Sequence, residues 1–338
     1  MANLKHMNND MAVSPIVATL VLIVVAVIGA VAVGTIMGTF STDVSKKANT
    51  GDISGASSTE ILIAGSTTVQ PASELLAKAY MEQNPSMKIN VQGGGSGAGV
   101  SSVGLGIVDI GSSSELAKIT DAIKSGKEEY KNLQVTQIGG SAVVVIVNDA
   151  FVPVAAGDFN VTQANLLAAY TSALVSYATP ADFGNIPSGT VLYTRGESSG
   201  TKDTFSEYIS LDGKTKTVTD KAKPVIGNDL MASTIKTATG NALGFADYGV
   251  AESAKAKMLG IGAPMAGKIP SKSNILDALK TGTDSKYPAG MTRGLFYVTQ
   301  GEPTSVVKNF ITFASSPGAN QYYNKAGMFG VTEFYATT

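Results

Sequence analysis

Short β-branched runs alternate with longer amphipathic stretches from Glu60 onward, and this alternation constrains the fold most. The first strand-like runs are 61–63, 89–91 and 108–110. Strands that alternate with helices in this way are typical of an α/β architecture. A chain of 338 residues with 44% hydrophobic residues is long enough for two lobes. The pattern also predicts strands at 142–147, the strongest in the chain, and 295–298, and helices at 72–84, 97–105, 162–170, 202–209, 229–239 and 304–314.

The N-terminal region carries an uncharged stretch from Met11 to Thr42. It is long and apolar enough to cross a bilayer as a helix, which we expect over residues 12–40. A Ser/Thr/Gly-rich linker without apolar periodicity follows at 41–59. Lys5 precedes the stretch and Lys46-Lys47 follow it, so the flanking charges leave its orientation undecided.

The segment Asp10–Leu20 resembles the N-terminus of archaeal type IV pilin-like precursors, which a prepilin peptidase cuts just before the hydrophobic helix. The resemblance implies a short leader, residues 1–11, and a cut near Met11/Ala12. An uncleaved signal anchor is the alternative. The resemblance also implies a single-pass protein of the cell membrane with the bulk of the chain on the extracellular side.

Composition excludes several functional classes. The chain has no cysteine, and its one histidine is His6, so thiol nucleophiles, cysteine-based zinc sites and imidazole catalysis in the part after residue 60 are excluded. A net charge of −1, with no basic cluster beyond Lys46-Lys47, argues against an extended nucleic-acid surface. We therefore expect no enzymatic activity, no cofactor, no metal site and no nucleic-acid partner.

Three Ser/Thr/Gly-rich loops each follow a predicted strand and open a helix. They are Gly65–Pro71, Gln92–Gly99 and Arg195–Thr201. In open α/β sheets, loops at the carboxyl ends of strands converge on the ligand, and glycines let the backbone approach it. Hydroxyls and free amides at helix N-termini are typical donors to a small anion.

Arginine is scarce, since the chain has only Arg195 and Arg293. A guanidinium beside a Ser/Gly/Thr loop offers fork-shaped donors to a tetrahedral oxyanion, so Arg195 is the expected counter-charge. Arg293 lies outside the three loops, and we interpret it as one member of a surface or inter-lobe ion pair.

Two other motifs fit parts of these loops. Gly93-x-Gly95-x-x-Ala98, with Glu115 downstream, matches a dinucleotide fingerprint, but it does not lie in the first strand-helix unit. The run Gly196–Gly200 matches a nucleophile elbow with Ser198 as the attacking serine, but no histidine follows it in the chain. Both motifs are weaker than the anion-binding interpretation.

Taken together, the loops resemble the phosphate-binding subunit of phosphate ABC transporters, a periplasmic-type substrate-binding family. The resemblance covers Glu60 to the C-terminus. It rests on the three loops, on Val108–Ser114, and more weakly on Ile138–Gly140 and Gly227–Asp229.

The resemblance implies an α/β fold, the two-lobed type II periplasmic binding protein fold, in which two open sheets are joined by a two-strand hinge. Lobe 1 would comprise residues 60–141 and 259–338, and lobe 2 residues 142–258. Its implied function is to capture inorganic phosphate and deliver it to an ABC permease. The implied ligand-binding residues are Thr67, Thr68, Ser96, Ser114, Arg195, Ser199, Gly200 and Thr201.

One position departs from the family pattern, because Ser114 stands where an aspartate accepts the proton of phosphate. A carboxylate there disfavours sulfate, which carries no proton, more strongly than a hydroxyl does. Asp109, Glu115 or Glu197 could compensate, although Asp109 also suits a strand-end turn. One alternative is therefore binding of another tetrahedral oxyanion such as sulfate. The N-terminal resemblance supports a second alternative, a pilin-like filament subunit that carries an oxyanion-binding domain.

Overall fold

The structure, a computed structural model, describes residues 59–173, 176–197, 199–210, 212–213, 215, 217–263 and 266–335. The chain divides into two units, 1–57 and 58–338, and the fold below is that of the second. The expected leader, the hydrophobic helix and nearly all of the linker lie outside the described residues. Among the helices that the structure does describe, none has the length and apolar character needed to span a membrane.

The main sheet is mixed, with the strand order β2-β1-β3-β11-β4-β8-β6-β7. Strands β1, β2 and β3 pair in parallel, whereas β11 is antiparallel to both β3 and β4. On the other side, β4 is antiparallel to β8, and β6 is parallel to β8 and β7. The bounds are β1 Thr59–Gly65, β2 Met87–Gly93, β3 Ile110–Ser113, β4 Leu133–Val147, β6 Val191–Arg195, β7 Lys223–Val225, β8 Ala242–Asp247 and β11 Thr292–Gln300.

Four short strands complete the described sheets. Strands β9 and β12 pair with β4, and β5 with β10 forms a separate two-stranded sheet. Their bounds are β5 Asn160–Val161, β9 Lys257–Met258, β10 Gly260–Ile261 and β12 Phe329–Gly330.

Three of the described helices begin at a residue whose side chain caps the first turn. Thr162, Ser271 and Thr304 each accept a hydrogen bond from the backbone N–H three residues later, which satisfies one otherwise unpaired donor of the first helical turn. The helices are α2 Gln70–Gln83, α3 Ser96–Gly104, α4 Leu116–Lys124, α5 Gln163–Ser172, α6 Gly200–Ile209, α7 Asn228–Thr237, α8 Tyr248–Ser253, α9 Lys272–Thr281, α10 Ser305–Ala314, α11 Asn320–Lys325 and α12 Val331–Phe334, with 3-10 turns at Glu128–Tyr130, Ala289–Met291 and Pro317–Ala319.

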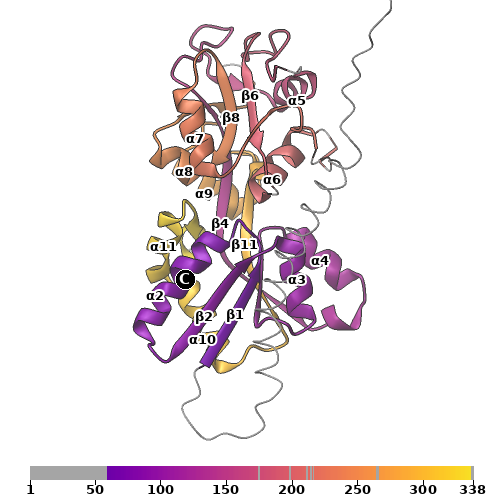
Figure 1. The fold of residues 1–338 in the computed structure, drawn as a ribbon, viewed down its shortest axis with the longest axis vertical. Helices are drawn as coiled ribbons and strands as arrows, with labels where there is room; N and C mark the ends of the chain where they lie inside the picture. Colours follow the sequence, from indigo (N-terminus) through magenta and orange to yellow (C-terminus); the bar gives the residue numbers. More distant parts are fainter. Residues whose placement is uncertain are drawn as a thin grey trace, which may run out of the picture. The chain divides into compact units, whose positions relative to one another are not determined.

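Two hydrophobic cores divide this unit into two lobes. The core of lobe 1 includes Ile61 and Ile63 of β1, Leu76 of α2 and Phe310 of α10. The core of lobe 2 includes the buried half of β4 from residue 142 to 147, together with side chains of β6, β8 and α5 to α7. Figure 1 shows β4 and β11 running between the two groups of elements.

Strand β4 belongs to both lobes. Residues 133–142 pair with β11, and residues 143–147 pair with β8. The second half is buried at every residue, which explains its uninterrupted apolar sequence. The first half reads Gln134, Thr136 and Gln137 among apolar residues, so the predicted strand at 142–147 was too short.

The chain returns to lobe 1 later than the sequence indicated. Leu259, Ile275 and Met291 belong to the core of lobe 2, whereas Leu295 and Tyr297 of β11 belong to that of lobe 1. The sequence analysis expected the return from residue 259. Helix α9 is amphipathic, and nothing in its sequence specifies which of two apolar cores its face contacts.

Candidate functional site

The first loop joins β1 to α2. The Ser66 side chain folds back onto it, because Ser66 Oγ accepts a hydrogen bond from the Thr68 backbone N–H at 3.2 Å. This turn buries Thr68 and leaves Thr67 exposed. Helix α2 begins at Gln70, two residues before the predicted start, with Pro71 in its first turn.

The second loop contains a conformation that requires glycine. Gly95 precedes α3 with φ of +92°, where a side chain would be strained. Its N–H donates to the carbonyl of Gly65 at 2.8 Å, so the second loop is tied directly to the first. The next residue, Ser96, is buried at the N-terminus of α3.

Ser114, at the end of β3, connects these two loops. Its N–H donates to Ser96 Oγ at 3.1 Å, and its hydroxyl accepts from Ser66 Oγ at 2.9 Å. Ser96 Oγ and Ser114 Oγ are 3.4 Å apart. Lobe 1 thus presents a cluster of three buried hydroxyls, and a hydroxyl can act both as donor and as acceptor.

The third loop holds Arg195 at the end of β6. Arg195 Nε donates to Glu197 Oε1 at 2.8 Å, Nη2 donates to the same oxygen, and Nη1 donates to Asn228 Oδ1 at 2.6 Å. These bonds occupy three of the five guanidinium N–H donors. Ser199 and Thr201 are buried at the start of α6, while Ser198 lies outside the described residues.

The loops of both lobes meet at Gly200, the first residue of α6. A β-carbon on Gly200 would overlap with Thr68 Oγ1. It would lie 2.9 Å from Arg293 Nη1 and 3.3 Å from Ser114 Oγ. Thr68 and Ser114 from lobe 1 and Gly200 from lobe 2 were all predicted site residues. The structure therefore brings predicted residues of the first and third loops together with Ser114, which is itself bonded to Ser96 of the second loop.

A cavity of about 860 Å³ lies beside this meeting point. Five of the predicted residues line it, and Ser96, Ser114 and Gly200 do not. Its walls also include Glu197, Asn228 and Asp247, which the site prediction did not contain. The five predicted residues that line it are Thr67, Thr68, Arg195, Ser199 and Thr201.

Asn228 and Asp247 connect the two arginines. The Asn228 amide accepts from Arg195 and donates to Asp247 Oδ2, and Thr201 Oγ1 donates to the same carboxylate oxygen at 3.0 Å. Asp247 Oδ1 accepts from Arg293 Nη2 at 2.8 Å. The Gly227–Asp229 segment was noted in the sequence, but nothing local distinguishes Asp247 from any other strand-end aspartate.

Arg293 is not a surface residue. It is 8% exposed, and it donates to Ser141 of the neighbouring strand and to Thr201 and Thr204 of α6 as well as to Asp247. The expectation of an ion pair is correct, but its surface alternative is wrong. The scarcity of arginine was the sequence signal that could have indicated a role for Arg293 near the site, because it applied to Arg293 as much as to Arg195.

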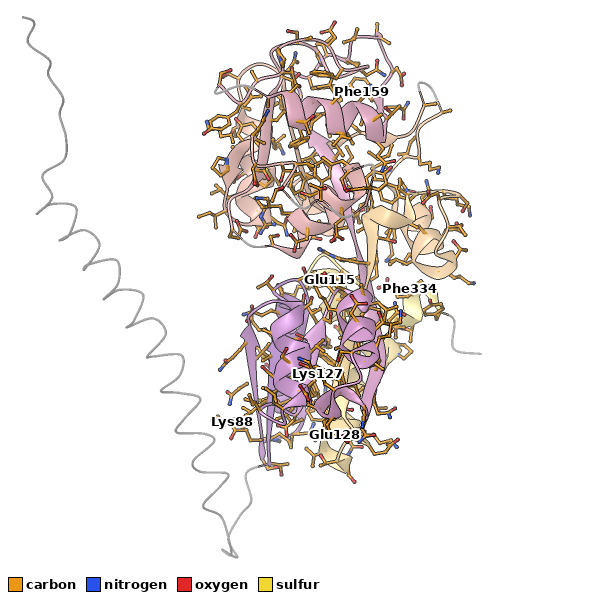
Figure 2. The ribbon with its side chains drawn as sticks, turned by 90° about the vertical axis from the view of Figure 1, so that its right-hand side faces the viewer. Lys88, Glu115, Lys127, Glu128, Phe159 and Phe334 are labelled. Atoms are coloured by element: carbon orange, nitrogen blue, oxygen red, sulfur yellow. The ribbon has the colours of Figure 1, made fainter. Side chains whose placement is uncertain are left out.

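The acids that could compensate for Ser114 lie in different places. Asp109 precedes β3, and its Oδ2 accepts from the Leu62 N–H at 2.9 Å, as expected of a strand-end residue. Glu115 lies at the end of lobe 1 nearer to lobe 2, as labelled in Figure 2, and is partly exposed. Of the three proposed acids, only Glu197 lines the cavity.

Electrostatics keep Glu197 charged. Burial raises the pKa of Glu197, but hydrogen bonds from Arg195 and from the Gly227 N–H outweigh this effect and hold the pKa below 4.5. Its second oxygen, Oε2, is buried without a hydrogen-bond partner among the described residues. Burial lowers the pKa of Arg293, and the Asp247 carboxylate opposes that shift. Arg195 with Glu197 and Arg293 with Asp247 thus form two ion pairs, of which Arg195, Glu197 and Asp247 line the cavity.

Within the described residues, no group of three or more His, Cys, Asp or Glu side chains is placed to hold a metal ion. The chemistry that the site offers is hydrogen bonding from hydroxyls, amides and guanidinium groups. Such a set suits an oxyanion whose charge is spread over several oxygens.

Comparisons with known proteins agree with this fold. The phosphate-binding protein PstS of Bacillus subtilis is 29% identical over 278 residues, which are 80% of this chain and 81% of that protein. An ABC-type phosphate transport receptor from Vibrio cholerae has a TM-score of 0.60 at 24% identity, covering 80% of this chain and 99% of that one. A putative phosphate ABC transporter substrate-binding protein from Clostridium perfringens, solved with bound phosphate, has a TM-score of 0.56 at 21% identity over 80% of this chain and 99% of that one. Residues 50–317 match the PBP superfamily domain, and the chain therefore belongs to the periplasmic binding protein superfamily.

Proposed function

We propose that this protein is an extracytoplasmic binding protein that captures inorganic phosphate between its lobes and delivers it to an ABC permease. The observation that carries the proposal is the convergence at Gly200, where hydroxyls of lobe 1 and a guanidinium meet the N-terminus of α6. A relative named as a phosphate-binding protein, covering 80% of this chain, supports phosphate as the ligand. The role is binding and release, without catalysis.

The proposed ligand-binding residues are those expected from the loops: Thr67, Thr68, Ser96, Ser114, Arg195, Ser199, Gly200 and Thr201. Arg195 supplies a formal positive charge whose orientation Glu197 and Asn228 fix. The backbone amides at the start of α6 and the buried hydroxyls supply neutral donors. Affinity would come from many aligned donors in a largely buried site.

Calorimetry on the purified full-length chain tests this proposal. We expect phosphate to bind with measurable heat, and Arg195→Ala to weaken binding about 100-fold, because it removes a charge-assisted, bidentate donor. Lys236→Ala is the matched control: it removes one cation from α7, where Lys236 donates to the Ala254 carbonyl, and should leave affinity unchanged. The absence of phosphate binding, or equal affinities of the wild type and Arg195→Ala, would refute the proposal.

Sulfate is the second candidate ligand, and Ser114 favours it. The acceptor position in lobe 1 is the Ser114 hydroxyl, which already accepts from Ser66, so this position carries no negative charge that would repel an unprotonated oxyanion. Titration with sulfate under the same conditions decides between the two anions. A sulfate affinity equal to or above that of phosphate would identify a general oxyanion-binding protein.

The membrane attachment is a separate part of the proposal. The uncharged stretch at residues 12–40 is long enough to anchor the binding domain to the cell membrane. Extraction of membranes with alkaline carbonate tests it: the full-length chain should stay with the membranes, and a variant without residues 12–40 should not. Release of the full-length chain would contradict the anchor.

A further inference from the structure

Arg293 occupies an unusual place for a structural arginine. It lies on β11, directly across from Ser141 on β4, and so on the two strands that run between the lobes. From there its side chain reaches lobe 2, where Nη1 donates to Thr204 Oγ1 at 3.1 Å and Nη2 lies 3.3 Å from Thr201 Oγ1. Thr201 is one of the proposed ligand-binding residues.

The hydrogen bonds of Arg293 leave one donor unused. Nε donates to Ser141, Nη1 to Thr204, and Nη2 to both Thr201 and Asp247. A guanidinium has five N–H groups, of which Nη1 carries two. One N–H of Nη1 is therefore not used by these bonds.

Nη1 is also the nitrogen nearest to the meeting point of the loops. It lies 2.9 Å from the position of a β-carbon on Gly200, the same position that Thr68 Oγ1 and Ser114 Oγ approach from lobe 1. The unused N–H thus belongs to a group that borders the proposed oxyanion site. A purely structural arginine would not need to place its guanidinium against the first residue of α6.

We propose that Arg293 is a second ligand-binding arginine, which donates to the bound oxyanion through Nη1 and holds Thr201 through Nη2. This inference rests on the proposed function and deepens it. The ligand class is a tetrahedral oxyanion with two negative charges, such as hydrogen phosphate. Two guanidinium groups from different elements, β6 and β11, would then contact one ligand.

Asp247 has a definite part in this arrangement. Asp247 neutralises Arg293 in a buried ion pair, because a buried cation without a partner is costly. When the oxyanion binds, Asp247 and the ligand share the same guanidinium. The Asp247 carboxylate therefore competes with the anion for Arg293 and repels it at short range.

Because of this competition, substitutions of the two partners of one ion pair should change phosphate affinity in opposite directions. Arg293→Gln should weaken phosphate binding about 30-fold or more, through loss of a charged donor. Asp247→Asn keeps the shape of the side chain and removes the repelling charge, so it should strengthen phosphate binding several-fold. A residue pair that only stabilised the fold would weaken binding in both variants.

Calorimetry with inorganic phosphate on the full-length chain measures both effects. Lys202→Gln is the matched control, because Lys202 lies on the first turn of α6 but pairs with Asp220 at 3.0 Å and does not line the cavity. It removes one positive charge from α6, the helix that the Arg293 side chain contacts, and should leave affinity within about twofold of the wild type. Thermal unfolding of each variant shows which of them fold.

The outcomes separate the two hypotheses. If wild-type protein binds neither phosphate nor sulfate, the proposed function fails, and this inference fails with it. If it binds phosphate, but Asp247→Asn binds it no more tightly, or Arg293→Gln binds it as the wild type does, only the role of Arg293 is overturned. Should Arg293→Gln fail to fold, the sign of the Asp247→Asn effect decides alone.

Discussion

Glu197 binds Arg195 through a single carboxylate oxygen. Oε1 accepts from Nε at 2.8 Å and from Nη2, and it also accepts from the Gly227 N–H at 3.0 Å. One oxygen therefore fixes the plane of the guanidinium, and one N–H of each terminal nitrogen of Arg195 is left for a ligand.

Because of this arrangement, the stability of the folded protein at acidic pH depends on whether the Glu197 carboxyl is ionised. The folded-state pKa of Glu197 is lowered, so its ionised form stabilises the fold above the ordinary pKa of 4.5, and this contribution is lost as pH falls through the lower folded value. We expect the melting temperature of the wild type to fall more steeply below pH 4.5 than that of Glu197→Gln. Thermal unfolding at several pH values measures it, and parallel profiles would contradict the expectation.

Gly200→Ala should block the site without unfolding the protein. The added methyl group would clash with Thr68 Oγ1 and crowd Arg293 Nη1, both of which border the meeting point of the loops. We expect phosphate affinity to fall at least about tenfold, because the lobes could no longer approach each other there. Gly97→Ala is the matched control, since a β-carbon on Gly97 meets nothing within 4 Å. Equal calorimetric affinities of the two variants would argue against a site at Gly200.

Ser114→Asp tests the departure from the family pattern. A carboxylate at this buried position would accept hydrogen bonds from Ser66 and from a protonated ligand oxygen, but it would repel sulfate. We expect the ratio of phosphate to sulfate affinity to rise about tenfold or more. Competition titrations of the two anions measure that ratio. A ratio that stays constant would show that discrimination lies elsewhere in the site.

A fourth prediction concerns the approach of the two lobes at Gly249. This residue of α8 packs against the backbone of Gly327, next to Met328 in the core of lobe 1, so closely that a β-carbon would overlap with the Gly327 Cα. Gly249→Ala should therefore hold the lobes apart. Small-angle scattering should show a larger radius of gyration with phosphate than the wild type has. Gly318→Ala, where the nearest atom is 3.7 Å away, is the control and should leave the radius unchanged.

The sequence predicted the elements that have a strong local pattern. Loops such as Gly65–Pro71 can be predicted from sequence, because a β-branched run, a cluster of hydroxyl residues and the start of a helix follow one another in the chain. Helix 304–314 was expected, and α10 with its Thr304 cap confirms it within one residue. The first half of β4 was not expected, since Gln134, Thr136 and Gln137 interrupt its apolar sequence without a regular alternation.

The parts of the site that sequence could not predict are those made by long-range pairing. Arg293 borders the site only because β11 pairs with β4 in a register that puts it across from Ser141. Asp247 belongs to the site only because β8 ends beside α6 and α7. In each case the side chain is ordinary for its local sequence, and its partners lie between 19 and 152 residues away in the chain.

The position of β11 between β3 and β4 has a consequence for how the chain is made. Translation delivers β1, β2, β3 and β4 early, but the strand that joins β3 to β4 comes only at residues 292–300. Apart from Phe329 and Phe334, the whole core of lobe 2 precedes it in the chain. During translation, lobe 2 can therefore complete most of its core before lobe 1 does, although lobe 1 begins earlier in the chain. The sheet of lobe 1 cannot be completed until its central strand, β11, has been synthesised.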